Sequence, residues 1–305
     1  MGIVDYLSYK FWDSVSKNSR KILKTRKYPE NVVEHLNVPY MDDNRWEHTM
    51  DVYYPDNRKM SNPVIIDIHG GGWMSGNNVF NKRFCYSLAE CGFVVVNINY
   101  RLIPTTDIAG QLEDCINAIN WVYNHIHYFC GDKNNIFLIG DSAGGFLASY
   151  SALITTSDTL ASKFHIKKPE AKIRALGLIS PVCYMQNMGT LQPYYDNLLK
   201  GFTVSGGDVS ILNIDKVIDE GKMPPTLMTT STGDVLAKKH TNKLHMLLKE
   251  KKITNQYFCW GLHKGKMLPH VFPIMYPELE ASKDIIQYIN AFFKSKIQAK
   301  TEMSE

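Results

Sequence analysis

The feature that most constrains the fold is a short apolar run that leads directly into a Gly-x-Ser-x-Gly motif. Residues 136–139 have the length of a short buried strand, and Gly140, Ser142 and Gly144 follow at once. Because a helix-like segment comes next, the pattern predicts a strand, a sharp turn and a helix, with the Ser142 hydroxyl raised at the turn. Glycine is expected where the backbone crowds itself. By itself the motif also fits a glycine-rich loop that binds phosphate or nothing, so its context decides.

The context is an alternation of strand-like and helix-like segments from about residue 63 onward. The expected strands are residues 64–68, 93–98, 136–139, 174–179, 226–230 and 255–260, and the expected helices are residues 82–91, 111–125, 238–251 and 279–297. This order predicts a mostly parallel, doubly wound α/β sheet. Residues 32–38 and 48–54 are expected to form two antiparallel strands before it. Sites in such sheets lie beyond the carboxyl ends of the strands.

The 305 residues are expected to form one domain, with two segments outside the α/β pattern. Apolar residues at helical spacing in residues 1–30 favour a helix packed on the domain over one lying on a membrane surface, because a strongly basic polar face is missing. Residues 182–222 break the alternation with aromatics and glycines, which indicates an inserted subdomain or lid.

Composition excludes several classes of function. The net charge is +4 without a long basic face, so nucleic-acid binding is not expected. No run of about 18 apolar residues is present, so no membrane span is expected, and the lack of an apolar leader indicates the cytoplasm. The six cysteines are scattered like buried free thiols. Since no spacing resembles a metal site, neither a metal nor another cofactor is predicted.

Acyl hydrolysis by a serine needs a base, a group that orients the base, and donors for the oxyanion. The expected chain order is serine, then an acid, then histidine. Asp234 fits the acid, because it follows the strand at residues 226–230 and Gly233 lets the chain turn there. The alternative is that Asp234 only caps the helix that follows.

Two histidines compete for the role of base. His263 lies close to the end of the last strand, among lysines that suggest an exposed loop. His270 is flanked by Pro269, Val271 and Phe272, which would hold it by packing. We therefore favour His270.

Residues 69–72 read His-Gly-Gly-Gly directly after a buried strand, which predicts the other half of an oxyanion hole. Glycines leave backbone N–H groups free there and let a carbonyl oxygen approach. Gly71 and Gly72, together with Ala143 at the start of the next helix, are the expected donors. His69 is expected to fix the loop by a side-chain hydrogen bond.

These motifs together resemble the hormone-sensitive-lipase-like group of α/β-hydrolases. The resemblance rests on His69-Gly70-Gly71-Gly72-Trp73, Gly140-Asp141-Ser142-Ala143-Gly144-Gly145, Ser180-Pro181, Gly233-Asp234 and His270-Val271-Phe272. It implies an α/β-hydrolase fold with an eight-stranded, mostly parallel sheet, helices on both faces and a small helical cap from about residues 1–45 and 182–222. It also implies carboxylesterase activity on short acyl esters without a cofactor. By matching positions, it makes Ser142, Asp234 and His270 the triad.

Two departures from the group's pattern bear on the substrate. The group usually has glycine after the catalytic histidine, where this chain has Val271, and Ala-Pro-Glu where this chain has Ile103-Pro104-Thr105. Trp73 and Tyr100 are candidates for the substrate pocket. Acetyl esters, including acetylated or feruloylated plant-polysaccharide fragments, are the expected substrates. An arylformamidase-like amide hydrolase and a catalytically silent binding protein are the alternatives, and a homodimer is compatible with the sequence.

Overall fold

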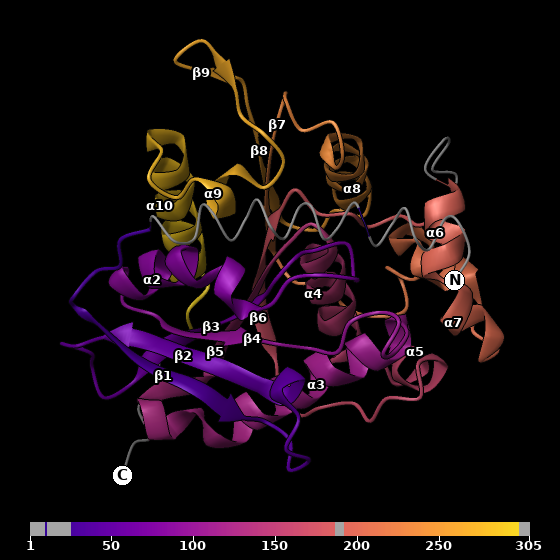
Figure 1. Cartoon of the computed structure of the whole chain (residues 1–305), viewed down its shortest axis with the longest axis horizontal. Coiled ribbons are helices and arrows are strands. Elements are labelled where there is room, and N and C mark those ends of the chain that lie inside the picture. The colour runs from indigo at the N-terminus through magenta and orange to yellow at the C-terminus, as the bar shows by residue number, and fades with distance from the viewer. Residues whose placement is uncertain (1–9, 11–25, 187–191, 299–305) are drawn as a thin grey trace.

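The computed structural model describes residues 26–186 and 192–298, together with Lys10. In this part of the chain, eight strands form one sheet in the order β1-β2-β4-β3-β5-β6-β7-β8, with helices on both faces (Figure 1). The strands are β1 (Val32–Pro39), β2 (Thr49–Pro55), β3 (Asn62–Ile68), β4 (Val94–Ile98), β5 (Gly131–Asp141), β6 (Ile173–Ile179), β7 (Thr226–Ser231) and β8 (Asn255–Trp260). Strands β3 to β8 run parallel, whereas β2 pairs antiparallel with both β1 and β4. The expected mostly parallel, eight-stranded α/β sheet is confirmed.

The four expected helices are present, each with ends within three residues of the prediction. The described α-helices are α2 (Lys82–Glu90), α3 (Ile108–His125), α4 (Ala143–Ile154), α5 (Asp158–Lys163), α6 (Gln192–Leu198), α7 (Lys200–Val204), α8 (Lys238–Glu250), α9 (Phe272–Met275) and α10 (Glu280–Lys294). Short 3-10 turns are η1 (Trp46–His48), η2 (Asn78–Phe80), η3 (Ile126–Phe129), η5 (Val209–Leu212) and η6 (Ile214–Lys216). Helix α3 begins three residues earlier than expected, because the Asp107 side chain caps it by accepting a hydrogen bond from the Gly110 N–H.

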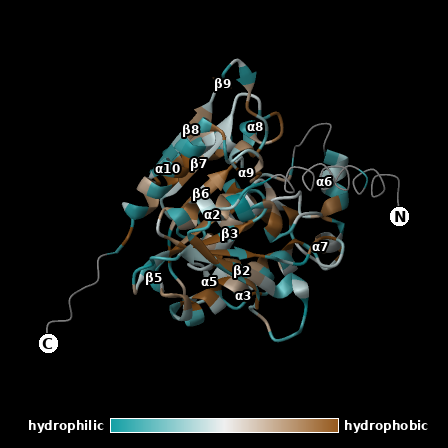
Figure 2. Cartoon of the chain, turned by 60° about the vertical axis from the view of Figure 1, so that its left-hand side comes forward, coloured by the Kyte–Doolittle hydropathy of each residue, from teal (hydrophilic) through white to brown (hydrophobic). Residues whose placement is uncertain are grey.

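The central strands are apolar on both sides, since successive side chains point to opposite faces of the sheet. On β3, Val64 and Ile66 belong to the core that includes α3, α4 and α8, whereas Ile65 belongs to the core that includes α2 and α10. Figure 2 shows hydrophobic strands in the middle of the molecule and more hydrophilic helices around them. Helix α4 is an exception, because all twelve of its residues are buried.

The two expected cap segments differ in what the structure shows of them. Residues 32–39 of the first segment form β1, an edge strand of the main sheet, because they pair antiparallel with β2 along its length. Residues 1–9 and 11–25 lie outside the described residues. Most of the second segment, residues 182–222, is described and carries α6, α7, η5 and η6 instead of further strands.

Among the helices of the described residues, none combines the length and the apolar character needed to cross a bilayer.

Helix α10 packs on the sheet through buried isoleucines and phenylalanines, and one of these contacts can be tested by a single substitution. Phe293 is fully buried and stacks on Phe137 with ring centroids 4.7 Å apart. We expect Phe293→Ala to lower the free energy of unfolding by about 3–5 kcal/mol, because it leaves a cavity between helix and sheet. Urea denaturation measures this. Asp284→Ala, at an exposed position of the same helix, should change it by only about 0.5 kcal/mol; an equal loss in both variants would contradict the interpretation.

Candidate active site

The turn between β5 and α4 is a strained elbow. Ser142 has φ 51° and ψ −116°, a conformation that is uncommon for a residue with a side chain. Space is the reason for the glycines: a Cβ on Gly144 would lie 1.9 Å from the Ile68 carbonyl oxygen, and one on Gly140 would lie 2.3 Å from the Gly144 carbonyl oxygen. The Ser142 N–H is held by the Ile179 carbonyl at 2.9 Å. The elbow thus presents Ser142 at the carboxyl end of the sheet, as expected from the sequence.

Three side chains from distant parts of the chain form one hydrogen-bonded series. His270 Nε2 lies 2.9 Å from Ser142 Oγ, and His270 Nδ1 lies 3.0 Å from Asp234 Oδ1. Since the carboxylate can only accept, Nδ1 carries the proton and Nε2 is left to accept from the serine hydroxyl. The other candidate, His263, lies in the separate hairpin strand β9 (Leu262–His263), opposite Lys266. The structure therefore brings His270 to Ser142.

Asp234 is held from several directions. Its Oδ1 accepts hydrogen bonds from the backbone N–H groups of Leu236 and Ala237, and its Oδ2 accepts one from the Thr230 hydroxyl at 3.0 Å. Burial alone would raise its pKa, but the hydrogen bond and the charge of His270 hold the pKa of Asp234 well below its usual range. Asp234 does not cap α8, because the N-cap of that helix is Ala237 and no side chain caps it. The carboxylate instead holds the turn before α8 and contacts His270.

The loop at residues 69–72 has its peptide groups oriented by carbonyl acceptors. The His69 Nδ1–H donates to the Gly70 carbonyl at 2.7 Å, and the Ser75 N–H and hydroxyl donate to the Gly71 carbonyl at 3.0 and 3.2 Å. In a trans peptide the N–H points opposite to the C=O, so these bonds also fix the N–H groups of Gly71 and Gly72. Among the described residues, neither N–H has a hydrogen-bond partner.

Ala143 supplies a third free donor. It is the first residue of α4, and within the part of the chain that the structure describes its N–H has no partner. The first N–H groups of a helix lack intrahelical acceptors and favour negative charge. The arrangement can therefore receive an oxyanion, with donors from two different loops.

His69, Tyr100 and Trp73 support this loop from inside the protein. Burial lowers the pKa of His69 to about 4, so the ring is neutral and keeps its bond to Gly70. Tyr100 stacks on it at 4.4 Å and donates its hydroxyl to the His69 carbonyl. Of the two pocket candidates, Tyr100 is 1% exposed and Trp73 is 2% exposed, with Trp73 packed edge-on against Phe146. Both are packed into the protein around the loop.

Two buried carboxyl groups share one amide below the site. The Asn81 side chain donates to Asp67 Oδ2 at 2.9 Å and to Asp141 Oδ1 at 2.8 Å, and Asp141 Oδ1 also accepts from the Gly70 N–H. Burial, and secondarily the nearby Asp141, raise the pKa of Asp67 to about 8. The pKa of Asp141 is also raised by burial. Asn81 lies 14 residues from Asp67 and 60 from Asp141 along the chain, so no local sequence pattern indicates this cluster.

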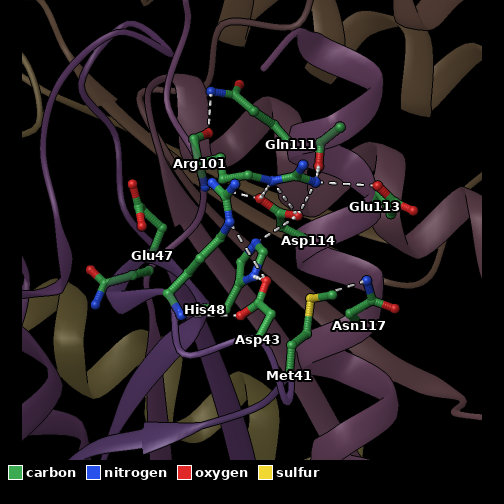
Figure 3. Close-up of polar contacts among 12 residues, drawn as sticks. Met41, Asp43, Glu47, His48, Arg101, Gln111, Glu113, Asp114 and Asn117 are labelled. Atoms are coloured by element: carbon green, nitrogen blue, oxygen red, sulfur yellow. Dashed lines mark hydrogen bonds and ion pairs between the residues drawn. The ribbon is translucent and has the colours of Figure 1, made fainter. Parts of the chain in front are cut away.

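A second polar network holds the segment that carries Tyr100 (Figure 3). Arg101 contacts buried Asp114 with both its backbone N–H and its guanidinium, and it also pairs with Glu113. His48 lies between Asp114 and Asp43, at 3.3 and 2.6 Å. The network therefore links helix α3 to the loop after β4 and to the turn before β2.

Gln111 connects this framework to the site. Its side-chain amide donates to the carbonyls of Trp73 and Arg101, at 2.8 and 2.9 Å. Two further contacts join segments that are distant along the chain. The Tyr194 hydroxyl of α6 contacts the Gly72 carbonyl at 3.0 Å. The Arg26 guanidinium donates to the carbonyls of Ile274 and Met275 in α9, the helix that follows His270. Neither has a local sequence signature.

No metal site accompanies these groups in the part of the chain described. There, no set of three or more His, Cys, Asp or Glu side chains is arranged to hold a metal ion.

The buried carboxyl pair predicts a pH dependence of stability. The ordinary pKa of an aspartate is near 4, so between about pH 4 and 8 folded Asp67 keeps a proton that the unfolded chain has released. The free energy of unfolding therefore falls as pH rises through this window. Asp67→Asn removes this contribution, and the stability of the variant relative to the parent should rise from pH 5 to pH 8 by up to about 1.4 kcal/mol per pH unit. Urea denaturation at both pH values measures it; parallel pH profiles would mean that Asp67 is not held protonated.

Comparison with known proteins connects this geometry to a family. The BD-FAE family model matches residues 50–259. The isoprenylcysteine alpha-carbonyl methylesterase ICME of Arabidopsis thaliana is 33% identical over 116 residues, a match that covers 38% of this chain and only 27% of that protein.

Solved structures agree with the fold over nearly the whole chain. Esterase B from Lactobacillus rhamnosus, of which one structure contains a tributyrin phosphonate inhibitor, is 26% identical, and its superposition covers 96% of this chain and 94% of that chain with a TM-score of 0.88. An esterase of the bacterial hormone-sensitive lipase family is 19% identical, with a TM-score of 0.73 over 94% and 92% of the two chains, which is a likeness of fold. The expected α/β-hydrolase fold is confirmed. The chain belongs to the BD-FAE family.

Proposed function

We propose that this protein is a serine carboxylic-ester hydrolase that acts on short-chain acyl esters. The observation that carries the proposal is the series Ser142–His270–Asp234, together with the N–H groups of Gly71, Gly72 and Ala143, which have no partner among the described residues. A nucleophile, a base, an orienting carboxylate and oxyanion donors are the parts that acyl transfer requires.

In the first step, Ser142 Oγ attacks the ester carbonyl carbon while His270 Nε2 takes the hydroxyl proton. Asp234 keeps the His270 ring in the tautomer that can accept this proton, and its charge stabilises the imidazolium that forms. The negative charge that develops on the former carbonyl oxygen is met by the N–H groups of Gly71, Gly72 and Ala143. Removing one such donor typically costs about 100- to 1000-fold in rate.

In the second step, the tetrahedral intermediate collapses and the alcohol leaves with the proton from His270, which leaves an acyl group on Ser142. Water then attacks the acyl carbon as His270 takes one of its protons. The acid is released, and the proton returns to Ser142 Oγ. Atoms and charges balance over the two steps, and no cofactor is required.

The proposal of a short acyl group is supported by the aromatic residues beside the donor loop and by one solved structure. Trp73 follows the proposed donors directly and is packed against Phe146 and Tyr195, which supports a site with aromatic walls. Helix α6 of the proposed cap contacts the same loop through Tyr194. The tributyrin-phosphonate complex of esterase B supports acyl groups of about this size. We propose acetyl and butyryl esters, including acetylated or feruloylated polysaccharide fragments, as substrates to test.

The nucleophile is tested with Ser142→Ala. We expect turnover of p-nitrophenyl acetate to fall by at least about 10,000-fold, because the covalent route is lost. A fluorophosphonate probe should label the parent protein once and the variant not at all. Ser149→Ala, another buried serine of α4, is the control and should retain both signals. Retained turnover in purified Ser142→Ala would reject the nucleophile, and an unlabelled, inactive parent protein would favour a silent binding protein.

The base is tested with the two histidines as a matched pair. His270→Gln should lower kcat for the same ester by about 1000-fold or more, because Ser142 loses its proton acceptor. His263→Gln should keep kcat within about threefold, since His263 lies in the separate hairpin. The reverse result would reassign the base. Comparing acetyl esters with N-formyl aromatic amines on the parent protein separates an esterase from a formamidase.

A further inference from the structure

A small hairpin at the carboxyl end of the sheet exposes large apolar side chains. Strands β9 (Leu262–His263) and β10 (Lys266–Met267) pair antiparallel and stand outside the main sheet, and Figures 1 and 2 show β9 projecting from the molecule. Leu262 and Met267 are directly opposite each other, so they share a face, and they are 66% and 68% exposed. The hairpin is therefore a regular structure whose two large apolar side chains stay exposed to solvent.

The neighbouring loop after β7 is exposed in the same way. Val235 is 92% exposed and Leu236 is 44% exposed. The two loops are packed together at their bases: the Ser231 hydroxyl donates to the Leu268 carbonyl at 2.6 Å, and Gly233 lies so close to Met267 that a Cβ would come within 2.9 Å of it. We call Val235, Leu236, Leu262 and Met267 the hairpin rim.

Exposed lysines lie on the hairpin and on the helix that follows the loop after β7. Lys264 and Lys266 are exposed on the hairpin, and Lys239 is exposed on α8. Lys264 is paired with a carboxylate, at 3.8 Å from Glu280, but its side chain remains 77% exposed. Apolar side chains bordered by lysines match a surface with an apolar interior and negative headgroups.

The hairpin rim also borders the site. Val235 follows Asp234 directly, and Met267 precedes His270 by three residues. We propose that the hairpin rim is a docking surface for an anionic lipid–water interface. Leu262, Met267 and Val235 enter the interface, and Lys264 and Lys266 contact the headgroups. This proposal rests on the proposed esterase function and deepens it. Docking there would bring ester substrates carried in the lipid interface close to Ser142.

A second copy of the chain is a poorer occupant of the same surface. Self-association through the rim would bring Lys264 and Lys266 near the same lysines of the partner, and like charges oppose such contacts. An anionic interface is attracted by every one of these groups.

The proposal is tested by sedimentation of the 305-residue chain with vesicles of ether-linked lipids, which contain no acyl ester to hydrolyse. We expect binding to vesicles with 30% phosphatidylglycerol and about tenfold weaker binding to pure phosphatidylcholine. The double variant Leu262→Ser/Met267→Ser should lose binding by about tenfold or more. Lys264→Gln/Lys266→Gln should reduce binding to anionic vesicles to the level of neutral ones.

Matched controls come from the opposite end of the sheet. Met60 is 89% exposed, and Lys59 beside it is also exposed, two or three residues before β3 begins. Met60→Ser and Lys59→Gln should leave vesicle binding unchanged, and thermal unfolding shows that every variant is folded.

Absence of binding by the parent, or equal loss in the Met60 control, would overturn the proposal. A dimer seen by sedimentation velocity that Leu262→Ser/Met267→Ser dissolves would replace the lipid surface with a second copy. Because vesicle binding does not depend on turnover, this test can confirm or reject the docking surface even if the proposed esterase function is wrong.

Discussion

The site depends on the close approach of two neighbouring parallel strands and the helix that follows one of them. Ile68 at the end of β3 is paired with Gly140 near the end of β5, so the loop at residues 69–72 and the Ser142 elbow leave the sheet side by side. Helix α4 can begin there only because position 144 has no side chain to meet the Ile68 carbonyl. This one backbone contact thus brings the Ser142 hydroxyl close to the N–H donors of residues 71 and 72. It does not depend on Asp234 or His270.

The same constraint explains why two buried carboxyl groups are tolerated below the site. Asp141 precedes the elbow and Gly70 begins the opposite loop, so a carboxylate there can accept from the loop backbone. Asn81 then joins Asp141 to Asp67, which leaves two carboxyl groups in an apolar interior with one shared amide. Such groups lower stability when ionised. Their retention is consistent with a protein that gives up some free energy of folding to hold the loop in one conformation.

What the sequence predicted well is what has a local physical signal. The buried strands, the four amphipathic helices and the elbow are each encoded within about fifteen consecutive residues, and the order of these elements largely determines a doubly wound sheet. The antiparallel pair β1 and β2 was expected as well, because the two strands are neighbours along the chain. The Asn81 bridge and the contacts of Arg26 and Tyr194 depend on distant segments, which one sequence does not reveal. The hairpin was not predicted, although Gly265 is a residue typical of tight turns. In the structure Lys264 and Gly265 have φ values of 49° and 76°, as a two-residue hairpin turn requires.

The exposed hairpin rim and the triad residues Asp234 and His270 lie on the same two loops, and their supports explain why they differ in exposure. Asp234 is fixed from below by Thr230 and by the backbone of Leu236 and Ala237, so the tip of its loop does not have to be buried to keep the carboxylate in place. His270 is likewise followed by α9, which packs on the core through Phe272. Because the catalytic side chains are held by contacts inside the protein, the outer residues of these loops are not needed to keep them in place. Large apolar side chains at such positions reduce solubility without adding to the core. An interaction with something outside the protein is therefore the simplest physical reason for keeping them.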